Sequence, residues 1–233
     1  MFPRQEIKSN AKAALKANYW PVIGILLLGS ILSGVIIGVA QIPSTVATVQ
    51  ASLAGVDYVP TTSLFTSCLS IVGGLISMLF EVGIARFAYR VYRGDAPEVG
   101  DLFAAFKDGN FGRVLGGMIL VGIYTFLWSL LFIIPGIVKA YQYSMMPYLL
   151  IDRPDLSIKE CFAMSKQMTS GFKWSLFVLE LSFIGWAILA VFTLGILDIF
   201  FVTPYLTLAM GGAYDYLKRT RMETTAETTE TAE

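Results

Sequence analysis

Six apolar stretches dominate the sequence, and most of them are long enough to cross a lipid bilayer. A membrane-spanning helix needs about 20 predominantly apolar residues. The stretches cover residues 21–41, 67–89, 114–134, 136–151, 174–193 and 196–216. With 55% hydrophobic residues, 15% charged residues and a mean hydropathy of +0.66, the chain is too apolar for an ordinary soluble domain. We therefore predict an all-α, polytopic membrane helix bundle with about six transmembrane helices.

The basic residues are distributed in a way that predicts the orientation of the chain. Sixteen of the 17 Lys and Arg residues lie in four groups that a six-span topology places on one side of the membrane. These groups occupy residues 4–16, 86–113, 153–173 and 218–221. Because basic connections are retained in the cytoplasm, we expect both the N- and C-termini to be cytoplasmic.

The second half of the chain indicates an internal repeat. Gly136 and Gly195, each followed by Ile, open corresponding apolar stretches, and Pro-Tyr pairs at Pro147 and Pro204 interrupt these stretches about three turns later. We predict a single membrane domain over residues 1–221, built from three helical hairpins that each follow an amphipathic interfacial helix. The repeat units cover about 2–93, 94–153 and 154–218.

Two segments lie outside this repeat plan. Residues 42–66 are predicted to form the main long loop between spans, and no structure is assigned to them. Residues 222–233 contain four Glu and no basic residue, so we expect a disordered acidic tail.

Residues 4–18 have the pattern of an amphipathic helix. The apolar positions are Ile7, Ala11, Ala14 and Leu15, and the basic positions are Arg4, Lys8, Lys12 and Lys16. This pattern predicts a helix in the headgroup zone. We expect its four basic residues, together with Lys173, to contact anionic lipid headgroups. The alternative is a solvated basic N-terminus that only follows the orientation rule.

Two further amphipathic segments precede later spans. Pro97 opens the first of them, whose apolar residues at helical spacing are Val99, Leu102, Phe103 and Phe106. In the second, Ser157 and Glu160 have the spacing of a capping box, and the segment ends at a GFKW hinge beginning with Gly171.

Charged residues within the predicted spans are the main candidates for a functional site, because charges inside a membrane are costly and are often functional. They are Glu81, Arg86, Lys139, Glu180 and Asp198. We expect Glu81 and Glu180 in the cytoplasmic third of the bilayer. Lys139 and Asp198 are predicted to form an ion pair between units. Glu180 is functional, or its side chain extends to the membrane interface, or it forms a structural pair with Arg86.

Pro147 and Pro204 are predicted to kink corresponding helices. Interrupted helices at matching positions of two repeats are typical of transporter binding sites. Proline kinks are also common in membrane helices without such a role, because neighbouring groups satisfy the freed carbonyl.

The sequence lacks the motifs of common enzymes. The absence of His excludes a His-dependent triad and the usual zinc sites, and no phosphate-binding loop or dinucleotide fingerprint is present. Asp152 and Asp155 offer a possible cation site, but their spacing around a proline is more typical of a turn and helix cap. Cys68 and Cys161 are predicted on opposite sides of the membrane, which excludes a disulfide between them. We expect a non-enzymatic protein with no cofactor, no metal and no nucleic-acid partner.

Several motifs resemble a bacterial integral membrane family, the domain of unknown function 975. They are R-x-x-I-K-x-x-A-K-x-x-L-K-x-N-Y-W at residues 4–20, IPGI at 134–137, D-x-P at 152–154, S-x-x-M-x-x-G-x-K at 165–173 and LSFIGW at 181–186. The resemblance implies a polytopic protein of the bacterial cytoplasmic membrane without an established activity. The plan is also distantly similar to membrane domains fused to some bacterial glycerophosphodiester phosphodiesterases.

Two functional hypotheses follow. The first is a membrane-organising or accessory factor that contacts anionic lipid and has an unknown protein partner. The alternative is a small-solute or lipid transporter or channel, with a polar path lined by the intramembrane charges.

Overall fold

The computed structural model describes residues 2–55, 64–107 and 109–230, and these residues form helices joined by short connections. In chain order the helices are α1 (Arg4–Ala17), α2 (Tyr19–Ala54), α3 (Leu64–Tyr92), the 3₁₀ helix η1 (Val99–Phe106), α4 (Phe111–Leu131), α5 (Ile133–Tyr143), α6 (Met146–Asp152), α7 (Ile158–Thr169), α8 (Lys173–Leu181), α9 (Ile184–Phe192), the π-helix η2 (Asp198–Val202) and α10 (Thr203–Glu230). No strand occurs among the described residues. The predicted all-α class is confirmed.

Three helical segments in the described part of the chain are long and apolar enough to cross a membrane. They are Ser67–Tyr92, Phe111–Leu131 and Lys173–Phe192. A fourth arises if α1 and Tyr19–Val35 count as one span, although the chain bends by 94° between them. The six predicted spans exceed this number. The fourth predicted stretch, 136–151, is divided into α5 and α6, and the sixth, 196–216, is divided between η2 and α10.

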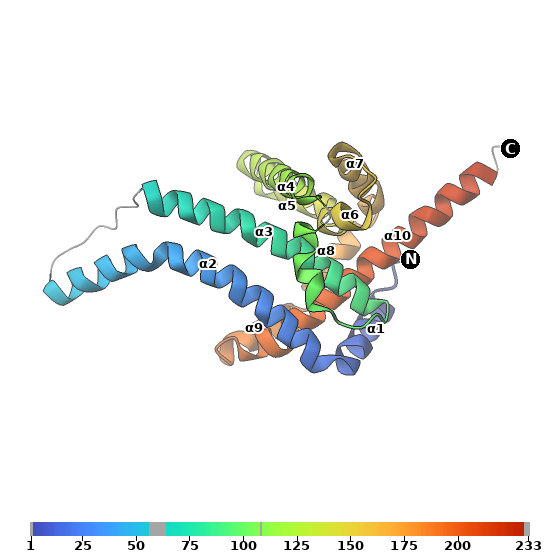
Figure 1. Ribbon diagram of the computed structural model, residues 1–233. Coiled ribbons are helices and arrows are strands. Elements are labelled where there is room, and N and C mark those ends of the chain that lie inside the picture. Colours follow the sequence, from blue (N-terminus) through green and yellow to red (C-terminus); the bar gives the residue numbers. More distant parts are fainter. Residues whose placement is uncertain (1, 56–63, 108, 231–233) are drawn as a thin grey trace.

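The helices are arranged in pairs that leave a common base in different directions. α2 and α3 lie side by side and extend to the left of Figure 1, and α4 packs on α5 and points in another direction. α10 runs past α3 and α1 toward the C-terminus. The N- and C-termini lie on the side opposite the tips of α2 and α3 (Figure 1).

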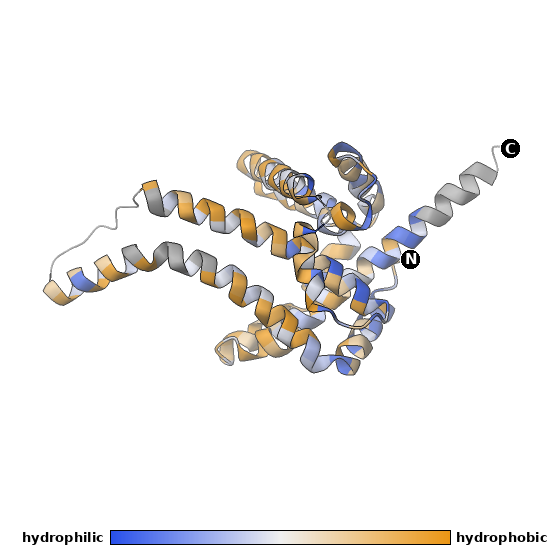
Figure 2. Ribbon diagram, in the orientation of Figure 1, coloured by the Kyte–Doolittle hydropathy of each residue, from blue (hydrophilic) through white to orange (hydrophobic). Residues whose placement is uncertain are grey.

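Polar residues concentrate at this common base. Figure 2 shows hydrophilic residues on α1, α7 and the middle of α10, whereas α2, α3, α4, α5 and α9 are mainly apolar. We call the region formed by α1, η1, α7, the polar part of α10 and the adjoining C-terminal ends of α3 and α6 the charged end of the molecule. Its position agrees with the sequence pattern in which basic residues gather between apolar stretches.

The core lies where α3, α6 and α10 pack together. Its largest fully buried side chains include Phe87, Met146, Leu149 and Tyr214. Gly211 permits the close approach of α10 to α3, because a Cβ added there would lie 2.8 Å from the Ala88 carbonyl carbon. Close backbone contact through small residues is typical of helix packing in membranes.

α1 matches the predicted amphipathic helix, but its apolar face has a different environment. Ile7, Ala11 and Leu15 are buried, and the helix packs along α10 and also contacts α3. Other helices therefore cover the apolar face of α1, and the predicted placement of this helix in the headgroup zone stays a prediction.

The segment that follows Pro97 also differs from its prediction. Val99, Phe103 and Phe106 are exposed, and only Leu102 of the four predicted apolar positions is buried. The segment is a 3₁₀ helix, in which residues three apart share a face. Asp101 and Ala104 are buried together, as are Leu102 and Ala105.

The turns in the last third of the chain are found where the sequence predicts them. Gly171 adopts φ +83° after α7, and Leu194 and Gly195 have φ of 52° and 82° between α9 and η2. Such values favour glycine, so Leu194 is the exceptional residue. The predicted capping box of Ser157 and Glu160 is present at the start of α7.

The two segments outside the repeat plan contain more helix than predicted. α2 continues through much of the expected 42–66 loop and ends at Ala54, where Gly55 adopts φ +65°. Residues 56–63 lie outside the described residues. α10 continues to Glu230, so the backbone of residues 222–230 is helical where we expected a disordered tail. Residues 231–233 again lie outside the described part of the chain.

Candidate functional site

A cavity of about 410 Å³ lies between α3, α4, α5, α6, α8 and α10. We call it the central cavity. Its lining residues are Glu81, Ile84, Ala85, Met118, Val121, Thr125, Ala140, Tyr143, Ser144, Pro147, Tyr148, Glu180, Leu206, Thr207 and Met210. The lining is mainly apolar with a few polar groups, which is the usual composition of a small-molecule site.

Two of the acids singled out by the sequence line the central cavity. Glu81 is contributed by α3 and Glu180 by α8, although 99 positions separate them in the sequence. The Glu180 carboxylate accepts a hydrogen bond from the Tyr141 hydroxyl. No Lys or Arg lies among the described residues that line the cavity. The site therefore combines two carboxylates with no basic side chain in its wall.

Pro147 lies at a helix break beside the cavity. α5 ends at Tyr143 and α6 begins at Met146, because proline lacks the N–H group that a continuous helix would use. Pro204 follows the π-helix η2 near the start of α10 but does not line the cavity. The two prolines therefore share a position next to an irregular backbone segment, but only Pro147 faces the candidate site.

Lys139 and Asp198 lie elsewhere, each with a partner of its own. The Lys139 ammonium lies 4.7 Å from the centre of the Trp128 ring and 3.4 Å from Gln142 Oε1. Asp198 accepts a hydrogen bond of 3.0 Å from the Thr203 hydroxyl. The predicted ion pair between Lys139 and Asp198 is wrong, because the two stretches that carry them pack against different helices.

The predicted structural pair of Glu180 with Arg86 is also wrong. Arg86 Nε donates to Asp101 Oδ1 at 3.1 Å. Arg90 binds the same carboxylate, with its NH1 group 3.0 Å from Asp101 Oδ2. Asp101 is 3% exposed, so the two guanidinium groups compensate a buried charge. They also fix η1 to α3.

Two further acids of the charged end have basic partners. Asp152 accepts hydrogen bonds of 2.6 Å from both Lys218 Nζ and the Tyr214 hydroxyl. Asp215 is buried and lies 2.7 Å from Arg219 NH2. Burial lowers the pKa of Lys218, but its hydrogen bond to Asp152 and the charge of that carboxylate outweigh this effect and raise it overall.

Sequence reasoning missed Asp101 and Asp215. Asp215 and Arg219 are four residues apart in a helix, a spacing that brings side chains together and that would have revealed this pair. Asp101 gives no comparable signal, because its partners lie on another helix and its burial depends on how η1 docks.

A second cavity, of about 440 Å³, lies at the charged end. Its lining residues are Arg86, Tyr89, Arg90, Asp95, Tyr148, Ile151, Asp152 and Pro154. We call it the charged-end cavity. Tyr148 lines both this cavity and the central cavity.

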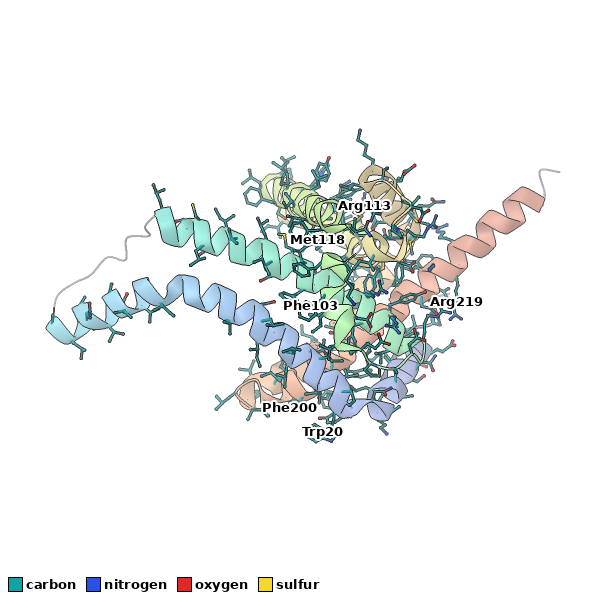
Figure 3. The ribbon with its side chains drawn as sticks, viewed as in Figure 1. Trp20, Phe103, Arg113, Met118, Phe200 and Arg219 are labelled. Carbon is teal, nitrogen blue, oxygen red and sulfur yellow. The ribbon has the colours of Figure 1, made fainter. Side chains whose placement is uncertain are left out.

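Arg113 of α4 holds the end of α6 in place (Figure 3). Its guanidinium group donates to the carbonyl oxygens of Leu150, Arg153 and Leu156 at 2.6, 2.7 and 2.9 Å. The last carbonyl groups of a helix have no partners within the helix, so Arg113 supplies donors that α6 needs. This residue was not singled out by the sequence.

The residues predicted to contact lipid headgroups fall into two groups. Arg4, Lys12 and Lys16 are exposed. Lys8 donates to Ser182 Oγ at 2.9 Å and lies over the Phe183 ring, and Lys173 donates to Gln142 Oε1 at 3.3 Å. Lys8 and Lys173 therefore have partners within the protein.

Asp152 and Asp155 do not form a common site. Asp155 pairs with Arg153 at 2.7 Å, and this hydrogen bond lowers the pKa of the Asp155 carboxyl. No group of three or more Cys, Asp or Glu residues positioned to hold a metal ion occurs in the described ranges. Cys68 and Cys161 are both free thiols.

Part of the chain is similar to a known protein family. A family model described as "Protein of unknown function (DUF975)" matches residues 133–220. The match contains the IPGI, D-x-P and LSFIGW motifs, and it includes Pro147, Tyr148 and Glu180 of the central cavity. No curated protein and no solved structure matches the chain. The resemblance expected from these motifs is confirmed over residues 133–220, the part of the chain that matches the model of this family.

Proposed function

We propose that this chain is an integral membrane protein of the bacterial cytoplasmic membrane that moves a small cationic solute through its central cavity. One observation carries the proposal: Glu81 and Glu180, from different helices, line the same cavity, and no basic residue lies among its described lining residues. Two carboxylates in a mainly apolar cavity favour a positively charged ligand, because unpaired charges away from water are costly.

The distribution of charge supports the proposed membrane placement. The basic groups lie between apolar stretches, and the positive-inside rule places such groups in the cytoplasm. In this arrangement three helix pairs cross the bilayer: α2 with α3, α4 with α5 and α6, and α8 and α9 with η2 and α10. The charged end is then cytoplasmic, together with both termini.

The interrupted helix beside the cavity supports transport over a purely structural role. Irregular backbone inside a membrane is tolerated where it is buried in protein or lines a cavity, and transporters use broken helices at their binding sites. The break between α5 and α6 adjoins Ser144, Pro147 and Tyr148, which all line the central cavity. The proposed function needs no enzymatic step and no cofactor.

Uptake into proteoliposomes tests this proposal. Purified protein is reconstituted with an inside-negative membrane potential, and uptake of radiolabelled tetraethylammonium is compared with uptake of radiolabelled benzoate. We expect uptake of the cation above that of protein-free liposomes and no uptake of the anion. Glu180→Gln should lower cation uptake, because it removes a charge from the cavity wall.

Asp155→Asn is the matched control, because Asp155 is an exposed acid that pairs with Arg153 outside the cavity. This variant should transport like the wild type. Equal uptake by wild-type protein and by Glu180→Gln would overturn the proposed role of the cavity.

The exposed cations of α1 favour a second candidate function, that of an accessory factor that contacts anionic lipid. Arg4, Lys12 and Lys16 are exposed on one helix, and each basic residue near an anionic surface contributes about 1 kcal/mol. The fraction of immobilised spin-labelled phosphatidylglycerol tests this contact. We expect this fraction to fall in a variant combining Lys12→Gln and Lys16→Gln. An unchanged fraction would argue against lipid selection by α1.

A further inference from the structure

Tyr148 is the one residue among the described lining residues that the two cavities share. Glu81, Pro147 and Glu180 lie with it in the central cavity. Arg86 and Asp152 lie with it in the charged-end cavity. A side chain that lines both cavities is positioned between them.

Tightly packed aromatic rings hold Tyr148 in this position. Tyr148 is 7% exposed, and its ring stacks on Tyr214 with a centroid distance of 4.8 Å and an interplanar angle of 14°. Tyr214 meets Tyr89 edge-on at 5.1 Å, and its hydroxyl donates to Asp152 at 2.6 Å. The closed packing thus depends on contacts between α6, α10 and α3.

The backbone around Tyr148 gives its ring a means to move. Tyr148 lies in the first turn of α6, five residues after the end of α5 at Tyr143. Arg113 holds the opposite end of this seven-residue helix. A helix that is fixed at one end and separated from its predecessor at the other can tilt with little loss of backbone hydrogen bonding.

We infer that Tyr148 is the barrier between the central cavity and the charged-end cavity, and that its displacement from Tyr214 joins the two into one path. This inference rests on the proposed transport function, because a barrier of this kind matters only if a solute passes. In this arrangement Tyr148 controls the entry of the solute into the central cavity from the side of the charged end.

Thiol labelling tests the barrier without measuring transport. Glu81→Cys is introduced together with Cys68→Ser and Cys161→Ser, and a membrane-impermeant maleimide is applied to the face that carries the charged end. Adding Tyr148→Ala should increase the labelling rate about tenfold, because the closed state loses an aromatic stack that opposes opening. Tyr148→Phe keeps the ring and should label as slowly as the background.

Tyr205→Ala is the matched control, because Tyr205 is as buried as Tyr148, each being 7% exposed, but lines neither cavity. It should leave the labelling rate unchanged. Tyr148→Leu provides a second test if Tyr148→Ala does not fold, and it too should accelerate labelling. Equal rates in Tyr148→Leu, Tyr148→Phe and the background would overturn the inference.

Labelling and cation uptake together distinguish a failure of the proposed barrier from a failure of the proposed function. Unchanged labelling with intact cation uptake would remove Tyr148 as the barrier and leave the transport proposal standing. Accelerated labelling without cation uptake would support the barrier and contradict the proposed substrate.

Discussion

The carboxylates of the charged end and those of the central cavity have different partners. Asp101, Asp152 and Asp215 each lie within 3.1 Å of a Lys or Arg nitrogen. In the central cavity, Glu180 accepts a hydrogen bond from the neutral Tyr141 hydroxyl. No salt bridge to Glu81 or Glu180 occurs in the part of the chain that the structure describes.

This difference separates a structural role from a functional one. A buried carboxylate with charged partners fixes helices to one another, and breaking such a pair is strongly destabilising. A carboxylate without a charged partner adds little to stability, yet it is available to a ligand. Composition alone does not distinguish the two regions, because both contain acidic side chains with the same carboxylate group.

Neutralising the cavity acids should give the largest effect on function. In a variant combining Glu81→Gln and Glu180→Gln, we expect cation uptake to fall about tenfold or more, because the cavity loses its attraction for positive charge. Thermal unfolding in detergent should be nearly unchanged. Strong destabilisation of this variant would contradict the distinction between the two regions, since it would give the cavity acids a structural role.

Neutralising an acid at the charged end should instead affect stability. Asp101→Asn should lower the free energy of unfolding by about 3 kcal/mol, because Arg86 and Arg90 lose a shared buried partner. Unfolding in detergent as a function of added sodium dodecyl sulfate measures this change. A loss no greater than that of Glu180→Gln would contradict the structural role of Asp101.

A larger side chain at the contact between α3 and η1 should also reduce the stability of the protein. A Cβ added at Gly83 would lie 2.7 Å from the Leu102 Cα, whereas one added at Gly74 would meet no atom within 4 Å. Gly83→Ala should therefore destabilise the protein by about 2 kcal/mol through overpacking. Gly74→Ala, on the same helix, should be neutral or slightly stabilising because alanine favours helix. Equal effects in the same unfolding assay would contradict the close approach of η1 to α3.

The capping box of α7 provides the smallest predicted effect. Ser157→Ala should cost about 1 kcal/mol by removing the side-chain acceptor for the Glu160 N–H group. Hydrogen bonds from Ser157 also lower the pKa of Glu160 from its ordinary value of 4.5. A carboxyl group whose pKa is lower in the folded than in the unfolded state stabilises the protein at pH values above the unfolded-state pKa. This stabilisation is lost as the pH falls through the folded-state pKa.

The difference in stability between wild-type protein and Glu160→Gln should therefore be present at neutral pH and disappear in acid. Hydrogen exchange of the α7 amide groups at several pH values measures it locally. A difference that grows below the ordinary pKa would contradict the predicted sign.

Local features of the fold were predictable from the sequence, because neighbouring residues determine them. The helix Arg4–Ala17, the capping box of Ser157 and the turns at Gly171 and Gly195 all depend on short-range patterns. The partner of Lys139 was not predictable in this way. It depends on how α4 and α5 pack, and the periodicity of one helix does not specify its neighbour.

The candidate site was likewise predictable from the sequence only in part. The cost of burying charge singled out Glu81 and Glu180 as unusual, but their meeting in one cavity required the packing of α3, α8 and α10. Asp101 was missed because its burial results from the docking of η1, whose 3₁₀ geometry changes which residues share a face.

Access to Glu180 from the two sides of the membrane tests the central claim most directly. Glu180→Cys is placed in a background with Cys68→Ser and Cys161→Ser, and a membrane-impermeant thiol reagent is applied from each side in turn. A cavity that passes a solute predicts labelling at position 180 from both sides. Labelling from the charged end alone, or from neither side, would contradict transport and would indicate a closed bundle whose unpaired acids serve another purpose.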